Sequence, residues 1–218
     1  VHKSANKGGE WTTISPDLTT NDPEKQKYGE SGGLTYDVTG AENHTCILAI
    51  EPSRLEQGLI WVSTDDGRVH VTQNGGETWT SVEKNIPGLE EGAWMPQIKA
   101  SRYEPGTAFL VVNDYRRNDW NPYLYKTTNF GKTWKSIVSS DDIAGFTMSF
   151  YQDPVEADLM WLGTENGLYF SIDGGEEWKH WSHGIPNVQI ADIVLQERER
   201  DLVLGTFGRA AYVIDDIG

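Results

Sequence analysis

Four copies of one eight-residue pattern constrain this chain more than any other feature of its sequence. The pattern reads [ST]-x-[DN]-x-G-x-[TE]-W and occupies Ser4–Trp11, Thr72–Trp79, Thr127–Trp134 and Ser171–Trp178. A pattern repeated four times within one chain indicates a repeat architecture, in which each copy belongs to one supersecondary unit.

Each position of the pattern has a physical reason. The opening Ser or Thr ends a strand, and the Asn or Asp accepts hydrogen bonds from turn amides. The glycine suits a backbone site with positive φ, and the tryptophan begins the next strand with a large apolar face. We therefore predict structural hairpin roles, not catalytic ones, for Ser4, Asn6, Gly8, Trp11, Thr72, Asn74, Gly76, Trp79, Thr127, Asn129, Gly131, Trp134, Ser171, Asp173, Gly175 and Trp178.

The spacing of the copies predicts an all-β propeller. The tryptophans at 11, 79, 134 and 178 are 68, 55 and 44 residues apart, and the shortest interval is typical of a four-stranded antiparallel blade, about 40–50 residues. The longer intervals contain insertions at Ser15–Asn43 and Tyr115–Tyr123, and insertions of this kind often carry function.

Blade boundaries follow if each repeat joins the third strand (C) of a blade to its fourth (D). Residues 1–13 then supply strands C and D of one blade, about 45–84, 96–138 and 146–181 supply three blades, and 189–216 supply strands A to C of another. We expect one partial propeller domain from a larger propeller, because open sheet edges invite pairing with other strands. Closure of the chain on itself with about four blades is the alternative.

Charge and hydropathy reduce the classes of partner that this chain can be expected to bind. The formal net charge is -15, with 33 acidic and 18 basic residues, which disfavours nucleic acid and anionic membranes. The sequence has no apolar run of about 18 residues, so we expect no membrane insertion. No cofactor is expected. Calcium at Asp141–Asp142 or Asn21–Asp22 is the open alternative, although neither segment has a calcium-loop signature, and His180 with His183 is too weak a pattern for a zinc site.

Candidate chemistry lies in the B–C and D–A loops, at the end of the blades opposite the repeated hairpins. Weak catalytic candidates there are Asp65, Asp66 and Glu165, because glycoside hydrolysis needs two carboxylates at a fixed separation. We favour the simpler interpretation that Asp-Asp-Gly and Glu-Asn-Gly are hairpin turns.

The insertion in the second complete blade is the best candidate for ligand binding. Aromatic rings beside arginines suit stacking of a sugar or capture of a peptide with an acidic end. Packing of the same rings over their own blade is the competing interpretation. The candidate ligand-binding residues are Tyr115, Arg116, Arg117, Trp120 and Tyr123 from the insertion, with Arg209 from a later loop.

Three segments give the chain a family resemblance. Trp61–Thr72, Pro122–Trp134 and Gly205–Ile217 resemble the sortilin-type propellers built from Asp-box (BNR) repeats, particularly large bacterial secreted proteins labelled glycosyl-hydrolase-like. The resemblance implies a propeller fold and export, and therefore an extracellular, cell-surface or periplasmic location. It does not imply one activity, because one fold hosts many functions.

Together these features predict a non-catalytic binding or scaffold propeller. Its ligand would be a protein, peptide or glycan bound by the B–C and D–A loops. A glycoside hydrolase using carboxylates of those loops is the first alternative. A purely architectural segment is the second, with the rest of its own polypeptide or a partner chain completing the propeller.

Overall fold

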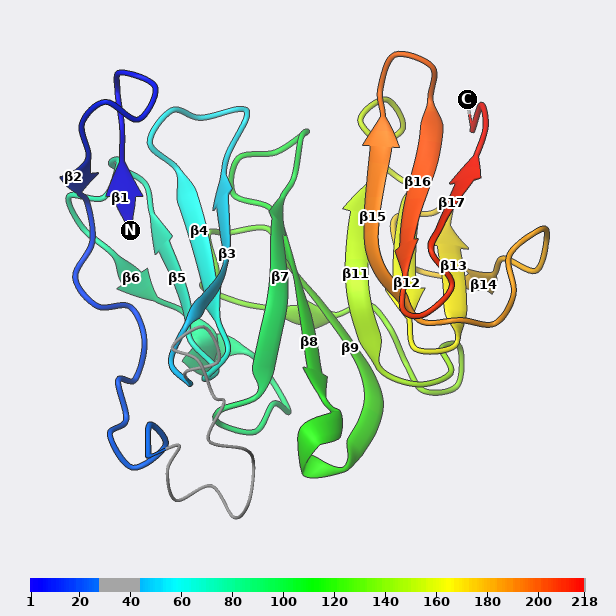
Figure 1. Cartoon of the computed structure of the whole chain (residues 1–218), viewed down its shortest axis with the longest axis horizontal. Coiled ribbons are helices and arrows are strands. Elements are labelled where there is room, and N and C mark those ends of the chain that lie inside the picture. Colours follow the sequence, from blue (N-terminus) through cyan, green and yellow to red (C-terminus); the bar gives the residue numbers. More distant parts are fainter. Residues whose placement is uncertain (28–43, 218) are drawn as a thin grey trace.

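The computed structural model describes residues 1–27 and 44–217, and these form an all-β fan of antiparallel sheets (Figure 1). A two-stranded sheet comes first, with β1 at His2–Lys3 and β2 at Thr12–Thr13. Three four-stranded sheets follow, and a three-stranded sheet ends the series. The all-β propeller-type architecture predicted from the sequence is confirmed.

Each four-stranded sheet is a simple meander in which consecutive strands pair. The first consists of β3 (Ile47–Pro52), β4 (Ile60–Thr64), β5 (Val69–Thr72) and β6 (Thr80–Ser81). The second consists of β7 (Trp94–Ala100), β8 (Ala108–Asp114), β9 (Asp119–Thr127) and β10 (Lys135–Ser136).

The last two sheets repeat this order. The third consists of β11 (Thr147–Gln152), β12 (Met160–Thr164), β13 (Gly167–Ser171) and β14 (Lys179–His180). The fourth consists of β15 (Ile190–Gln196), β16 (Asp201–Thr206) and β17 (Ala211–Ile214). Two short 3₁₀ turns lie at Glu83–Asn85 and Tyr115–Arg117, and no helix in the described part of the chain is long and apolar enough to cross a membrane.

The hydrophobic core lies between successive sheets. All seven residues of β8 are buried, because alternate side chains of this strand point to opposite faces and both faces are covered. Leu110 packs with the first sheet, around Trp61, whereas Phe109 packs with the third sheet, around Phe150. This burial on both faces explains why the sequence of β8 is almost continuously apolar instead of alternating.

Strand A of each sheet (β3, β7, β11 and β15) lies on the inner side of the fan, next to strand A of the neighbouring sheet. Every A strand has a register shift against its B strand at the same place, its first residues. A β-bulge bends a strand and redirects its side chains. The bulges therefore shape the same end of the fan in all four sheets.

The two ends of the fan carry different loops. The A–B turns and the C–D hairpins lie at one end, which we call the box face, and it is at the top in Figure 1. The B–C turns and D–A connections lie at the other end, the B–C/D–A face. Part of the Ser15–Asn43 insertion, residues 28–43, lies outside the described residues.

Candidate functional site

The repeated hairpins have one hydrogen-bond network. In the second copy the Thr72 hydroxyl accepts the amides of Asn74 and Gly76, at 3.4 and 3.0 Å, and Asn74 Oδ1 accepts the Thr78 amide at 2.9 Å. The hydroxyl of Thr72 also donates to Asn74 Oδ1 at 2.9 Å. The glycine at the fifth position of the pattern has a φ of +91° in the first copy, +100° in the second, +76° in the third and +94° in the fourth. The network in the other copies joins Ser4 to Asn6 and Gly8, Thr127 to Asn129 and Gly131, and Ser171 to Asp173 and Gly175.

The later hairpins also bind the sheet that precedes them. Trp79 Nε1 donates to the carbonyl oxygen of Ile14 at 2.8 Å, and Trp178 Nε1 donates to that of Ile137 at 2.7 Å. Trp134 is buried edge-on against Trp61, with ring centroids 6.1 Å apart. The hydroxyls and the Asn or Asp side chains of the hairpins thus hold the turns together, and the later tryptophans pack against the preceding sheet.

The Asp65–Asp66 turn, on the B–C/D–A face, is buried and internally satisfied. Asp66 accepts hydrogen bonds from the amide and hydroxyl of Thr20, at 2.6 and 2.7 Å, and from the hydroxyl of Thr64. Asp65 accepts the amide of Cys46 at 2.6 Å, and His44 Nδ1 lies 3.9 Å from its second oxygen. Both carboxylates thus bind backbone from elements distant in sequence.

These adjacent carboxyl groups have opposite pKa shifts. Burial raises the pKa of Asp65 above its ordinary value, despite the opposing hydrogen bond from the Cys46 amide. Burial also opposes ionisation of Asp66, but its hydrogen bonds from Thr64 and Thr20 outweigh burial and lower its pKa.

Three further carboxylates of this face differ in their partners. Asp114 forms a two-pronged ion pair with Arg117, with both N–O distances 2.7 Å. Asp119 accepts the Tyr123 hydroxyl at 2.6 Å. Glu165, which follows β12, has a buried Oε2 with no hydrogen-bond partner in the described structure.

The insertion forms an aromatic platform, which we define as Trp94, Tyr115, Arg116, Trp120 and Phe146. Tyr115 stacks on Phe146 from the next sheet, with centroids 4.5 Å apart and an interplanar angle of 22°. The Trp120 ring contacts both, with its centroid 6.2 Å from that of Tyr115 and 5.8 Å from that of Phe146. The Trp120 residue is nevertheless 51% exposed. The Arg116 guanidinium lies 3.9 Å from the Trp94 centroid and 4.6 Å from that of Tyr115.

Of the other predicted ligand-binding residues, Arg117 and Tyr123 hold the insertion in place, whereas Arg209 lies apart from the platform. Arg117 fastens the insertion through Asp114 and through the carbonyl oxygen of Glu91, at 2.8 Å. Tyr123 bonds Asp119, and burial together with that carboxylate raises its pKa. Arg209 lies in the B–C turn of the fourth sheet, between β16 and β17, whereas the platform spans the second and third.

Two cavities flank the loops described so far. One of about 310 Å³ lies on the B–C/D–A face beside the first sheet and is lined by Asp66, Arg68, Glu83, Leu89 and Met95 among others. A larger one of about 780 Å³ lies between β9–β10 and the fourth hairpin copy.

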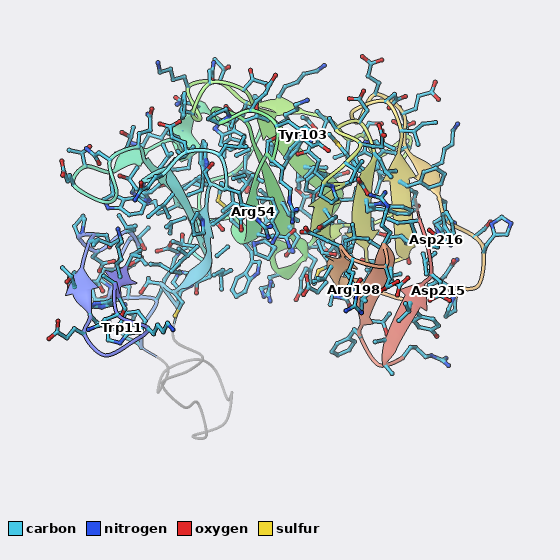
Figure 2. All side chains as sticks on the ribbon, turned by 90° about the horizontal axis from the view of Figure 1, so that it is seen from above. Trp11, Arg54, Tyr103, Arg198, Asp215 and Asp216 are labelled. Carbon is cyan, nitrogen blue, oxygen red and sulfur yellow. The ribbon has the colours of Figure 1, made fainter. Side chains whose placement is uncertain are left out.

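Sequence reasoning missed one cluster, on the box face where the A strands end. Arg54, Lys99, Arg102 and Glu197 line a cavity of about 220 Å³ there, with Tyr151 on its wall. Arg54, Tyr103 and Arg198 mark the loops of this face in Figure 2. A second repeat in the sequence could have revealed this cluster, because the dipeptides Ser53-Arg54 and Ser101-Arg102 each follow an A strand.

Comparison with known structures shows the same fold in proteins of several functions. The chain superposes on an ancestral GH74 enzyme with a TM-score of 0.67 and 16% identity, over 100% of this chain and 27% of that one. A GH74 xyloglucanase from Xanthomonas campestris gives 0.63 and 12%, over 98% and 32%. YCF48 bound to D1 peptide gives 0.56 and 14%, over 79% and 50%.

Sequence comparison agrees with this picture. A probable oligoxyloglucan-reducing end-specific xyloglucanase from Neosartorya fischeri is 27% identical over 143 residues, which is 59% of this chain and 16% of that protein. The chain thus spans a minor part of the length of these relatives. The sequence model of the family described as "Sortilin, neurotensin receptor 3" matches residues 60–207. The resemblance inferred from the repeats is confirmed, and the chain belongs to the Sortilin-Vps10 family of propellers.

Proposed function

We propose that this segment binds a protein, peptide or glycan on its B–C/D–A face without catalysing a reaction. The observation that carries the proposal is the aromatic platform. Trp120 is half exposed although its ring is fixed, because its Nε1 donates to Asn118 Oδ1 at 3.1 Å and its ring contacts Tyr115 and Phe146. An exposed, immobilised ring loses little entropy when a ligand stacks on it.

Arg116 adds a polar element to the same surface. Its guanidinium carbon lies over the rings of Trp94 and Tyr115, and a guanidinium held against aromatic rings can still donate hydrogen bonds to a ligand acceptor. Arg117 is unsuited to that role because Asp114 already occupies it. The platform therefore offers one flat apolar contact and one oriented cation, a combination that fits a sugar ring or a peptide with an acidic end.

The comparisons suggest two probes for this proposal. The xyloglucanase relatives suggest xyloglucan oligosaccharides, and the peptide complex of YCF48 suggests a D1-type peptide. We expect one of them to bind in isothermal titration calorimetry and to lose at least about tenfold in affinity with Trp120→Ala, since stacking is worth about 1–3 kcal/mol.

Trp11→Ala is the matched control, because Trp11 is 64% exposed but lies on the box face. It should leave affinity unchanged. Equal loss in both variants, or binding unaffected by Trp120→Ala, would reject the platform as the site.

Glycoside hydrolysis is the second candidate, and one observation favours it. Glu165 is the member of the Asp65, Asp66 and Glu165 set with an unpartnered buried carboxylate oxygen, in the described structure, and the similar proteins include GH74 enzymes. Reducing-sugar release from xyloglucan that disappears with Glu165→Gln would support it. Unchanged release with Glu165→Gln would exclude this residue as an acid or nucleophile.

We also infer that the protein is exported, as the family resemblance implies. Fractionation of cells producing the full-length protein should place it outside the cytoplasm. If the terminal sheets β1–β2 and β15–β17 prove to pair with further strands while both probes fail to bind, the purely architectural role replaces the binding role.

A further inference from the structure

The mouth of the inner wall on the box face holds a cluster of interacting charges. Three cations, Arg54, Lys99 and Arg102, surround the 220 Å³ cavity together with the carboxylates Glu51 and Glu197. They come from the ends of three A strands and the loops that follow them. The cluster carries one surplus positive charge in a chain whose formal net charge is -15.

Glu197 bridges the two arginines from the far side of the fan. Its Oε1 lies 2.6 Å from Arg102 Nη1 and 3.5 Å from Arg54 Nη1. Glu197 follows β15 of the fourth sheet, whereas Arg54 and Arg102 follow β3 and β7 of the first and second. A single carboxylate oxygen thus pairs with two guanidinium groups, each of which has five N–H donors.

The bridging carboxylate of Glu197 is half exposed, whereas Arg102, one of the two arginines that it contacts, is largely buried. The side chains of Arg54 and Glu197 are 67% and 49% exposed, and ion pairs between exposed side chains contribute little to the stability of a fold. Arg102 is largely buried, and its Nη2 donates to the Tyr151 hydroxyl at 3.3 Å. Exchange of Glu197 for another carboxylate therefore costs little and meets a preorganised guanidinium.

We propose that this mouth is a second binding site, which takes an acidic side chain of a partner peptide in place of Glu197. Glu197 itself shows the chemistry of the ligand, because a glutamate side chain occupies the position. A cavity of about 220 Å³ has room for a side chain but not for a folded element. The site lies on the box face, at the opposite end of the sheets from the aromatic platform, so it does not depend on the proposed function.

The test uses a fluorescent hexaglutamate peptide, acetylated and amidated so that only side-chain carboxylates are presented, with hexaglutamine as its uncharged counterpart. Fluorescence anisotropy should detect hexaglutamate and not hexaglutamine. Arg102→Gln should weaken binding by about tenfold or more and Arg54→Gln by about threefold, because charge-assisted bonds are lost. Glu197→Gln should strengthen binding by about threefold or more, because the internal competitor is removed.

Arg198→Gln is the matched control. Arg198 is 81% exposed on the same loop as Glu197 and pairs with Glu199 at 2.7 Å, so its loss removes one charge without touching the cavity. It should change affinity less than either Arg54→Gln or Arg102→Gln. Thermal melting establishes that each variant is folded. If Arg102→Gln does not fold, the proposal is judged on Arg54→Gln and Glu197→Gln, which alter exposed side chains.

Two results would overturn the proposal. The first is Glu197→Gln binding hexaglutamate no better than the unmodified protein. The second is Arg198→Gln weakening binding as much as Arg54→Gln, which would reduce the effect to overall charge. Neither result bears on the platform, whose own test rests on Trp120 and Trp11.

Discussion

The first hairpin copy, Ser4–Trp11, and the three later copies share one local structure but differ in what surrounds them. All four have the same hydroxyl–amide network. In the later copies the tryptophan and the glycine at the fifth position of the pattern pack against the preceding sheet, whereas Trp11 is largely exposed. The network is therefore a property of the eight residues, and the packing role is a property of the neighbouring sheet.

The glycines at the fifth position of the pattern show the same difference between the first copy and the later ones. A Cβ on Gly76 would overlap the carbonyl oxygen of Ile14, and one on Gly131 would lie 2.8 Å from the Val82 side chain. A Cβ on Gly8 would meet only Trp11 of its own hairpin, at 3.8 Å. The glycine thus has two functions, a positive φ in every copy and close contact between sheets in the later copies.

Truncation of the tryptophans should give the largest contrast. Trp178→Ala should lower the free energy of unfolding by about 3–5 kcal/mol, because a large buried ring is lost, together with its bond to Ile137. Trp11→Ala should cost no more than about 0.5 kcal/mol. Urea titration of both variants measures the difference, and a cost for Trp11→Ala close to that of Trp178→Ala would refute the distinction.

Alanine at the glycines should give a smaller contrast. Both Gly131→Ala and Gly8→Ala place a side chain at positive φ, which costs about 1–2 kcal/mol. Gly131→Ala should cost about 1–3 kcal/mol more through overpacking against Val82. The same urea titration provides the test, and equal costs would show that the preceding sheet yields to the added methyl group.

Removal of the hydroxyls should reveal how burial changes the same bond. Ser171 is buried, and its hydroxyl satisfies a buried amide of Gly175 at 2.9 Å. Ser171→Ala should therefore cost about 1–3 kcal/mol, and Ser4→Ala, in an exposed hairpin, about 0.5 kcal/mol. If hydrogen exchange of the Gly175 amide stays as slow in Ser171→Ala as in the unmodified protein, this bond is not what protects it.

The smallest effect concerns pH and the one copy that carries Asp instead of Asn. Hydrogen bonds from the Glu177 amide and the Ser171 hydroxyl lower the pKa of Asp173. A lowered pKa contributes stability above the ordinary carboxyl range, and this contribution is lost as pH falls through the folded-state value. Asp173→Asn should leave stability near pH 7 almost unchanged and flatten its decline below about pH 4. Thermal midpoints between pH 2.5 and 7 test this, with Asn129→Asp as the reciprocal variant.

The fold was predictable because its information is local. A short acceptor, a glycine and a tryptophan at fixed spacing specify the hairpin, and the interval between copies specifies the unit. The interface role of the glycines was not predictable, since it depends on Ile14, Val82 and Ile137, residues that no motif connects to them.

The candidate sites were predictable only in part. The insertion drew attention by its length and aromatic content, but the stacking of Tyr115 on Phe146 joins residues of different sheets. Asp65 and Asp66 looked like a turn, and their bonds to Cys46 and Thr20 come from distant backbone. Pairwise contacts of this kind leave no periodic trace in a sequence, and neither does the bridge from Glu197 to Arg54.

The hydrogen bonds from Trp79 to Ile14 and from Trp178 to Ile137 have a direction along the chain. Each tryptophan is made after strands A to C of its own sheet, and its acceptor belongs to the end of the sheet made before it. During synthesis, which proceeds from the N-terminal side, Ile14 and Ile137 are therefore made before the tryptophans that bond to them. In these two copies the repeat that defines the architecture thus also links each sheet to the one made before it.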